Sequence, residues 1–313
     1  MTYEEFLKQW RDTGTDVQCR TSGSTGTPKS ILLPKTEMSK SALRTVRHFG
    51  LDRFSHLHSC ISPDFIGGKM MAVRAEETGA RLTWETPSNR PLMQAGQDAI
   101  DLLAVVPSQM EYILSHMDMM PEIRAIIIGG SAIPAALRRR IEESGLNAWE
   151  TYGMTETASH IALRRVTDPP SPFRVLDGIS TGVDGESRLV IEMEGWQKIV
   201  TNDIVRIIGQ REFVVTGRYD NVIISGGIKI HPEQAEEILE ATFGVPVLIT
   251  SVPDNKWGER VIMIIEDGED RASDTKIISR CKECLPKAWV PKEILHQNVP
   301  TTENGKKKRK NIL

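Results

Sequence analysis

Residues 102–128 read LLAVVPSQMEYILSHMDMMPEIRAIII, with two short apolar runs on either side of an amphipathic segment. The runs 102–106 and 124–128 have the length and composition of strands that are buried on both faces of a sheet. Pro107 comes where the intervening helix would begin, and proline suits that position because the first helical amides have no partner within the helix. The stretch therefore predicts a strand, a helix over 107–117 and a second strand, the repeating unit of a parallel sheet.

The same alternation continues on both sides of this stretch. Before it, the sequence predicts a strand over 31–33, a helix over 36–49 capped by Thr36 and ended by Gly50, a helix over 68–78 ended by Gly79, and a strand over 81–84. After it, the sequence predicts a helix over 134–144 and a strand over 148–151. This rhythm predicts an α/β fold in which helices cover a largely parallel sheet.

Beyond residue 152 the pattern becomes shorter and richer in strands. Strands are predicted over 188–193, 198–200, 205–208 and 212–216. A separate set of elements begins near Arg218, with strands over 222–224, 247–252 and 260–266 and helices over 232–242 and 276–284. We therefore expect one domain over residues 1–217 and a second over residues 218–313.

The composition is that of an ordinary soluble globular chain. Of the 313 residues, 39% are hydrophobic and 26% are charged, and the formal net charge is -3. This balance gives no reason to expect a nucleic acid or a membrane as partner, and no apolar run approaches the roughly 18 residues that cross a bilayer. Cys281 and Cys284 have no second pair to complete a zinc site, so two reduced thiols are expected. With no secretory signal pattern at the N-terminus, we expect a cytoplasmic protein, and its oligomeric state is left open.

The strongest local signal is TSGSTGTPK at residues 21–29. Glycines let a backbone approach a ligand closely, while hydroxyls and a lysine add donors for phosphate oxygens. The run nearly matches a Walker A loop, but Pro28 replaces a required glycine and removes a backbone donor, which disfavours a P-loop NTPase. A phosphate-binding loop and a plain flexible turn remain. The candidate ligands are Thr21, Ser22, Gly23, Ser24, Thr25, Gly26 and Lys29.

Together with four later segments, this loop resembles the signature of the adenylate-forming superfamily of acyl-CoA synthetases, adenylation domains and luciferases. The segments are YGMTE at 152–156, TND at 201–203, GRYD and SGGIKIHP within 217–232, and NGKKKR at 304–309, in the family's order. The resemblance implies a large N-terminal α/β domain and a small mobile α+β C-terminal domain. Family members carry a much longer segment before the loop, so we expect the large domain to be truncated at its N-terminus.

The resemblance also implies how the nucleotide is bound. Tyr152, followed by Gly153, would stack on adenine, and the segment with Gly130 and Ser131 matches the family's adenine-edge segment more loosely. Thr155 would donate to the α-phosphate.

The other polar residues of these motifs receive roles in the same way. Glu156 would hold Mg²⁺, a hard cation that prefers carboxylate and phosphate oxygens. Asp203, which follows the strand predicted over 198–200, would accept hydrogen bonds from both ribose hydroxyls, although Asn202 replaces the glycine of the family motif. Arg218 would bind the ribose or phosphates, unless it forms a salt bridge at the domain boundary.

Two residues of the C-terminal segment carry the family's catalytic cycle. Lys306 would stabilise the charge that develops when a carboxylate attacks the α-phosphate. Asp220 occupies the hinge position about which family members rotate the small domain between adenylation and thioester formation. Lys307, Lys308 and Lys310 have no family role that we can assign and are expected to be solvated.

Within the superfamily, the chain most resembles shortened o-succinylbenzoate–CoA ligases of menaquinone biosynthesis. Residues 66–74, 153–162 and 220–227 carry this resemblance. It implies ATP, Mg²⁺ and coenzyme A as cosubstrates and a carboxylic acid with a second, non-reacting carboxylate. Lys69 and Arg74 lie on a helix that glycines open, where cations and a helix N-terminus favour an anion, and Ser159 and His160 would line the same pocket.

Two other functions stay open at this point. One is an aryl or fatty acid–CoA ligase, or a stand-alone adenylation enzyme that serves a carrier protein. The other is a nucleotide-binding relic without activity. Retention of Glu156 and Lys306 disfavours the relic, because binding ATP alone requires neither a magnesium carboxylate nor a movable lysine.

Overall fold

Five parallel strands form the centre of the larger unit of the chain. Along the sheet their order is β7 (Ala148–Gly153), β6 (Ile126–Ile128), β5 (Leu102–Val105), β3 (His56–Ser59) and β4 (Arg81–Trp84). Beyond β7, β8 (His160–Arg165) and β9 (Phe173–Val175) continue the sheet in antiparallel fashion. The predicted α/β fold is confirmed; the sheet is parallel over these five strands and antiparallel beyond β7.

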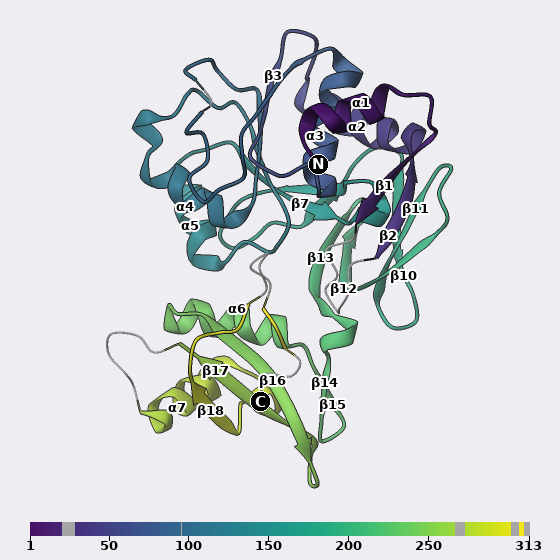
Figure 1. The fold of residues 1–313 in the computed structure, drawn as a ribbon. Coiled ribbons are helices and arrows are strands. Elements are labelled where there is room, and N and C mark those ends of the chain that lie inside the picture. Colours follow the sequence, from purple (N-terminus) through teal and green to yellow (C-terminus); the bar gives the residue numbers. More distant parts are fainter. Residues whose placement is uncertain (21–28, 95, 267–272, 302–306, 310–313) are drawn as a thin grey trace. The chain divides into compact units, whose positions relative to one another are not determined.

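The computed structural model describes residues 1–20, 29–94, 96–266, 273–301 and 307–309. The chain forms two units. The first contains residues 1–133, 137–180 and 193–197, and the second contains 134–136, 181–192 and 198–313. Figure 1 identifies their elements. The domain boundary expected near Arg218 stays a prediction.

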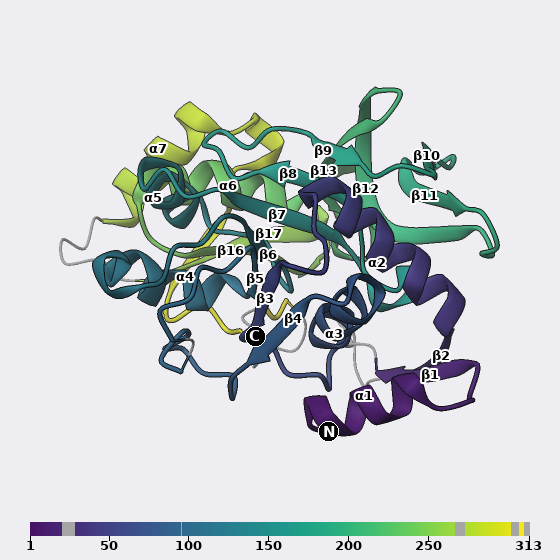
Figure 2. The same ribbon diagram turned by 90° about the horizontal axis from the view of Figure 1, so that it is seen from above.

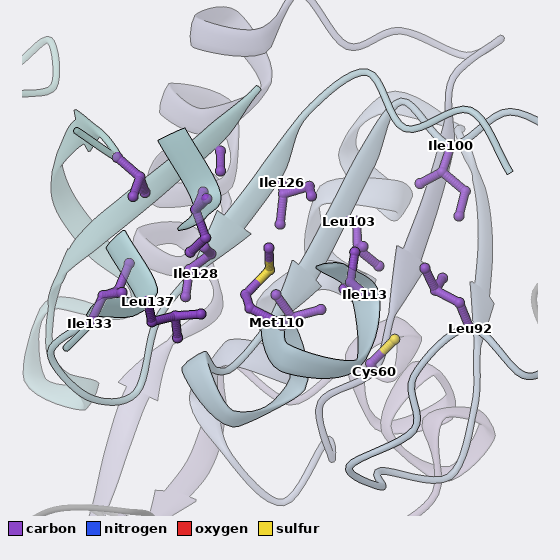
Figure 3. Packing of buried hydrophobic residues seen from close by; sticks show 14 residues of the cluster. Cys60, Leu92, Ile100, Leu103, Met110, Ile113, Ile126, Ile128, Ile133 and Leu137 are labelled. Carbon is purple, nitrogen blue, oxygen red and sulfur yellow. The ribbon is translucent and has the colours of Figure 1, made fainter. Parts of the chain in front are cut away.

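Helices cover both faces of the parallel sheet because its strands are apolar on both sides. On one face, Leu103 and Ile126 pack against Met110 and Ile113 of α4 (Pro107–Ser115), as Figure 3 shows. Leu137 and Ile141 of α5 (Ala135–Glu143) belong to the same cluster. On the other face, alternate residues of the same strands pack with α2 (Lys35–Phe49) and α3 (Ile66–Thr78); the cluster includes Leu102, Ile127, Val46 and Met71. A short helix, η1 (Met117–Met119), follows α4.

The ends of α2 and α3 test the expected helix signals. Gly50 and Gly79 end the two helices in the left-handed conformation, with φ of 64° and 70°, as predicted. The predicted threonine cap is wrong, because α2 already begins at Lys35 and no side chain caps it. Pro34, in extended conformation, occupies the cap position instead.

An N-terminal helix was absent from the sequence prediction. Thr2 and Glu5 form a reciprocal capping box at the start of α1 (Tyr3–Arg11), a pattern that is visible in the sequence. The helix buries Tyr3 and Phe6 in a cluster that also includes residues of α2, α3 and the antiparallel pair β1 (Asp16–Arg20) and β2 (Ser30–Pro34). Figures 1 and 2 show α1 beside α3, and α2 also contacts α3.

The second unit begins with antiparallel strands. Strand β10 (Ile179–Val183) leads from the first unit into the second, and β11 (Arg188–Met193), β12 (Ile199–Gly209) and β13 (Glu212–Arg218) follow as neighbours. The two strands predicted over 198–200 and 205–208 are a single strand, β12. The short helix η3 (Tyr219–Asn221) follows β13.

The rest of the second unit has a sheet and a hydrophobic core of its own. Strand order is β15 (Ile228–Ile230), β14 (Ile223–Ser225), β17 (Gly258–Ile265) and β16 (Val247–Asp254), and β18 (Glu293–His296) pairs with β17 in parallel. Gly226 and Gly227, with φ of 58° and 78°, form the two-residue turn between β14 and β15, which needs positive φ at both positions.

Two helices of this unit complete its core. α6 (Pro232–Phe243) begins with proline as predicted, and α7 (Asp274–Cys284) follows β17; the short helix η4 (Lys287–Trp289) precedes β18. Leu239, Cys281 and Met263 are buried in one cluster. Cys281 is buried and Cys284 is half-buried, and the two form no disulfide. Among the helices that the structure describes, none combines the length and the apolar character needed to cross a membrane.

Candidate functional site

Two of the adjacent parallel strands bring predicted nucleotide-binding residues to one edge of the first unit. Strands β6 and β7 are paired in parallel, so their carboxyl ends lie at the same edge. Gly130 and Ser131 follow β6, while Tyr152 and Gly153 end β7. The carboxyl edge of a parallel sheet is where ligands of α/β proteins bind, because loops that leave neighbouring strands diverge there.

Close backbone packing gives the segment after β7 its shape. A Cβ atom on Gly153 would lie 2.3 Å from the carbonyl oxygen of Ser159, so only glycine fits there. The chain then forms the short helix η2 (Thr155–Thr157) and turns back through Ala158, which has φ of 60°. The Thr157 hydroxyl donates to the Ser159 carbonyl over 2.6 Å and closes this turn.

Thr155 and Glu156, the two residues predicted to lie near the phosphates, differ in their exposure to solvent. Thr155 is buried, with 8% of its surface exposed. Glu156 is exposed and forms no ion pair or hydrogen bond with any residue that the structure describes. An accessible carboxylate without a competing cation fits the predicted magnesium ligand, because a hard cation shared with phosphate must remain open on one side.

Tyr152 is half-buried at the end of β7. Its ring centroid lies 5.5 Å from that of Phe173 in β9, with 54° between the planes. The guanidinium of Arg164 lies 4.2 Å from the centroid of Phe173. Neighbouring strands therefore fix the tyrosine ring, which retains some exposed surface for a stacking ligand.

In the second unit, Arg218 binds both Asp203, the candidate ribose ligand, and Asp220, the candidate hinge residue. Asp203 and Arg218 lie opposite each other on β12 and β13. Arg218 donates to Asp203 over 3.1 Å, and to Asp220 over 3.0 and 3.1 Å. Burial alone would lower the Arg218 pKa, but the hydrogen bond to Asp220 and the charges of Asp203 and Asp220 raise it. Asp203 lies inside β12 and not after a strand, so that part of the prediction is wrong.

Three of the four predicted acid-binding residues come together in the first unit. Arg74 on α3 donates to the Ser159 hydroxyl over 2.9 Å. Ser159 is 3.4 Å from Nδ1 of His160, whose Nε2 is 3.0 Å from the hydroxyl of Thr45 on α2. Thr45 is a member of this cluster that sequence reasoning missed, because a threonine in the middle of a helix carries no local signal of function.

Arg74 is a buried cation that meets no carboxylate among the residues that the structure describes. Only 1% of its surface is exposed, its other hydrogen bond is to the sulfur of Met71, and its Nε has no partner among the described residues. Burial lowers the pKa of Arg74 to about 9, so its guanidinium remains charged at pH 7. Burial, and next the charge of Arg74, lower the pKa of His160 well below its usual range, so that imidazole is neutral.

Lys69 has different partners from the other acid-binding candidates. Its ammonium group donates to the Pro63 carbonyl and lies 5.5 Å from the centroid of the Phe6 ring. Lys69 and Arg74 are five positions apart on α3, and five residues turn a helix by about 140° beyond a full turn, which points them to different sides. The structure therefore separates Lys69 from the Arg74 cluster.

The phosphate loop and the catalytic lysine fall mostly outside the described residues. Thr21, Ser22, Gly23, Ser24, Thr25, Gly26 and Lys306 lie outside them. Lys29 is described and is exposed directly before β2. The roles of these residues stay predictions.

The residues directly after Lys306 are fixed in the second unit. Lys307 donates to Glu236 over 3.0 Å and to Glu240 over 2.7 Å, so its predicted solvation is wrong. Arg309 pairs with the same Glu236 through both ends of its guanidinium. Glu236, only 3% exposed, also accepts the backbone N–H of Ile249 over 2.7 Å. Lys308 is exposed, as expected, and Lys310 lies outside the described residues.

Removing the charge of Glu236 tests whether this anchor matters for activity. In Glu236→Gln, the buried acceptor of both cations becomes neutral, so Lys307 and Arg309 lose their shared carboxylate. We expect the adenylation rate to fall about 10- to 100-fold, because displacement of a catalytic group by about 1 Å costs this much. The measurement is pyrophosphate release at saturating ATP, with trypsin cleavage near Lys307 followed in parallel. Glu283→Gln, an exposed change on α7, is the control. Wild-type adenylation by Glu236→Gln would contradict the expectation.

Comparisons with known proteins agree with this arrangement. The family profile of AMP-binding enzymes matches residues 18–183. A 2-succinylbenzoate–CoA ligase of Bacillus cereus is 25% identical over 312 residues, which cover 87% of this chain and 64% of that protein. The ligase of the same name from Listeria monocytogenes is 26% identical, with 98% of this chain and 72% of that protein covered. The chain thus spans about two thirds of the length of these curated relatives.

Solved structures share the fold. An acyl-CoA synthetase (AMP-forming)/AMP-acid ligase II-like protein from Dyadobacter fermentans superposes with a TM-score of 0.65 and is 29% identical, with 97% of this chain and 90% of that chain covered. The o-succinylbenzoate CoA synthetase of Bacillus subtilis, in complex with its acyl-adenylate intermediate, has a TM-score of 0.81 at 19% identity, with 95% and 69% covered. The sheet, the loops at its carboxyl edge and the matched family profile lead to one conclusion: the chain belongs to the AMP-binding enzyme family.

Proposed function

We propose that this protein is an ATP-dependent acid–CoA ligase that converts o-succinylbenzoate to its CoA thioester through an acyl-adenylate. The relatives from Bacillus cereus and Listeria monocytogenes bear the name of this activity. In the first step, a carboxylate oxygen attacks the α-phosphorus of ATP and the bond to pyrophosphate breaks. In the second, the thiol of coenzyme A attacks the acyl carbon, loses its proton and displaces AMP.

The buried guanidinium of Arg74 is the observation that supports this acid. A buried charge without a counter-ion is costly, since attraction to an opposite charge must offset its loss of water. Arg74 finds only a hydroxyl and a thioether among the described residues. In this proposal, an acid with two carboxylates reacts through one and supplies negative charge to Arg74 with the other, which Ser159 and His160 would bind as well.

The residues of the family motifs bind and orient the nucleotide in this proposal. Tyr152 stacks on adenine, Asp203 accepts from the ribose hydroxyls, and Thr155 donates to the α-phosphate. Glu156 holds Mg²⁺, which when bound neutralises phosphate charge. The loop 21–29 binds the pyrophosphate end, and Lys306 stabilises the charge on the attacking oxygen and the α-phosphate.

The hinge proposal assigns Arg218 a role in the change between the two steps. Arg218 binds the carboxylate of Asp220. Rotation of the C-terminal segment about Asp220 would change the backbone angles of that residue and so affect this ion pair. Arg218 also binds Asp203, so the hinge and the ribose ligand share one cation. Nucleotide at Asp203 would thereby influence the hinge through Arg218.

A substrate panel tests the proposed function. Pyrophosphate release is measured with ATP, Mg²⁺ and either o-succinylbenzoate, benzoate, an amino acid or a fatty acid, and thioester is then measured after addition of CoA. We expect rapid release with o-succinylbenzoate only. Preference for benzoate or a fatty acid would indicate a different acid ligase. Adenylation without thioester formation would indicate transfer to a carrier protein, and no release with any acid would overturn the enzymatic proposal.

A further inference from the structure

Three potential metal ligands that the proposed reaction does not use lie at the carboxyl ends of β3 and β4. His58 is in β3, Cys60 comes directly after that strand, and Glu85 comes directly after β4. The strands are parallel, with Ser59 opposite Trp84, so the next position in register sets Cys60 opposite Glu85. Alternate residues of a strand point to the same face of the sheet, so His58 lies on the same face as Cys60 and Glu85.

The donor atoms of these residues are close together and shielded from water. One ring nitrogen of His58, Sγ of Cys60 and one carboxylate oxygen of Glu85 lie within 4.8 Å of one another. The three residues are only 1%, 1% and 6% exposed. Donors around a tetrahedral zinc ion are about 3.5 Å apart, so small side-chain rotations would close the site.

One ring nitrogen of His58 has a hydrogen-bond partner, and the other has none among the described residues. Nδ1 of His58 is 2.7 Å from the hydroxyl of Thr83, whereas its Nε2 is buried and has no hydrogen-bond partner among the described residues. A hydrogen bond at one ring nitrogen that leaves the other free is the usual arrangement of a metal-binding histidine.

The charges of the three side chains match a divalent cation. Once binding of the ion has removed the proton of the Cys60 thiol, the thiolate and the carboxylate contribute two negative charges and the imidazole none, so a 2+ ion makes the buried group neutral. Nitrogen, sulfur and oxygen donors together suit zinc, whereas magnesium and calcium prefer oxygen alone. Glu85 also accepts the backbone N–H of Leu92 over 2.6 Å, so an ion here would join β3, β4 and the loop that follows β4.

We propose that His58, Cys60 and Glu85 bind one divalent cation of the zinc class, which holds the edge of the parallel sheet together. On binding, the thiol of Cys60 gives its proton to solvent and its sulfur coordinates the ion. The site is structural and does not depend on which acid the enzyme activates. Its ligands also differ from Glu156, the proposed magnesium ligand.

Metal titration of the full-length chain tests the proposal. The protein is stripped with a chelator, dialysed and titrated with Zn²⁺ alone and, in parallel, with Co²⁺. We expect about one ion per chain and, with Co²⁺, a thiolate-to-cobalt charge-transfer band from Cys60. Stripping should lower the unfolding temperature, and added Zn²⁺ should restore it.

Matched cysteine variants locate the ion. Cys60→Ser should weaken zinc binding about 100-fold or more, since even the partners of metal ligands are worth 10- to 100-fold, and should abolish the charge-transfer band. His58→Asn should weaken binding similarly, because asparagine can replace the hydrogen bond at Nδ1 but offers no atom at Nε2. Cys284→Ser, a half-buried thiol elsewhere in the chain, should bind like the wild type.

Three outcomes would overturn the proposal. The first is a stripped wild-type chain that binds no stoichiometric zinc, a result that does not depend on whether any variant folds. The second is a folded Cys60→Ser protein that keeps wild-type affinity and the charge-transfer band. The third is loss of the band in Cys284→Ser, which would assign the ion to the pair Cys281 and Cys284.

Discussion

Lys306→Ala is expected to lower the rate of acyl-adenylate formation by about 10²–10³-fold, the usual effect of removing one group that stabilises charge in a transition state. In adenylation, negative charge accumulates on the α-phosphate and the attacking oxygen, and a nearby ammonium group offsets it. Thioester formation from acyl-adenylate involves neither the attack on phosphorus nor the departure of pyrophosphate. The second step should therefore proceed at close to the wild-type rate in the variant.

Separate assays of the two steps distinguish this role from general damage. Pyrophosphate release reports the first step, and thioester formation from supplied acyl-adenylate and CoA reports the second. Lys308→Ala is the matched control, because Lys308 is an exposed lysine of the same tail. The control should have wild-type rates in both assays. Equal loss of both steps in Lys306→Ala would refute the assignment of Lys306.

Arg74→Met is expected to raise the apparent KM for o-succinylbenzoate about 10- to 100-fold, the effect of losing a charge-assisted hydrogen bond worth roughly 1.5–3 kcal/mol. Because the proposed function assigns Arg74 to the non-reacting carboxylate of the acid, the KM for ATP should not change. Methionine fills a similar volume without a charge. Since Arg74 has no anionic partner to leave behind among the described residues, the unfolding temperature should stay the same or rise.

A second buried cation on the same helix provides the comparison. Lys69 is 3% exposed, and its ammonium group binds the Pro63 carbonyl, apart from Ser159 and His160. Lys69→Met should leave the KM for o-succinylbenzoate within about twofold of wild type, since it removes no contact of the Arg74 cluster. An unchanged KM in a folded Arg74→Met protein would show that Arg74 does not bind the acid.

The central strands and helices of the fold could be predicted because the residues that specify them are close together in the sequence. The apolar runs around 102–106 and 124–128 are strands β5 and β6, and Pro107 begins α4. Gly50 and Gly79 end helices as predicted, because a left-handed residue strongly favours glycine. The prediction failed where tertiary contacts outweigh local preference. Helix α2 begins before Thr36, and β12 continues through Asp203 because its neighbour β13 pairs along it.

The motifs gave the candidate residues but not their partners. Nothing near Arg74 in the sequence indicates that Ser159 lies within hydrogen-bond distance of it, since 85 positions separate the two residues. The basic tail was predicted to be solvated, yet Lys307 and Arg309 bind Glu236, more than 70 positions earlier. Charge runs of this kind carry no local mark that distinguishes a solvated lysine from one that is paired across a fold.

The sequence by itself determined the family, the α/β architecture of its first part and the order of the motifs, because all of these follow from residue type and spacing along the chain. The tertiary structure alone decided which residues meet. It placed Arg74 beside Ser159 and His160, with no carboxylate near it in the described part of the chain, and brought His58, Cys60 and Glu85 to one face of two parallel strands. Partnership, burial and unsatisfied charge depend on contacts between distant segments, and these exist only once the chain has folded.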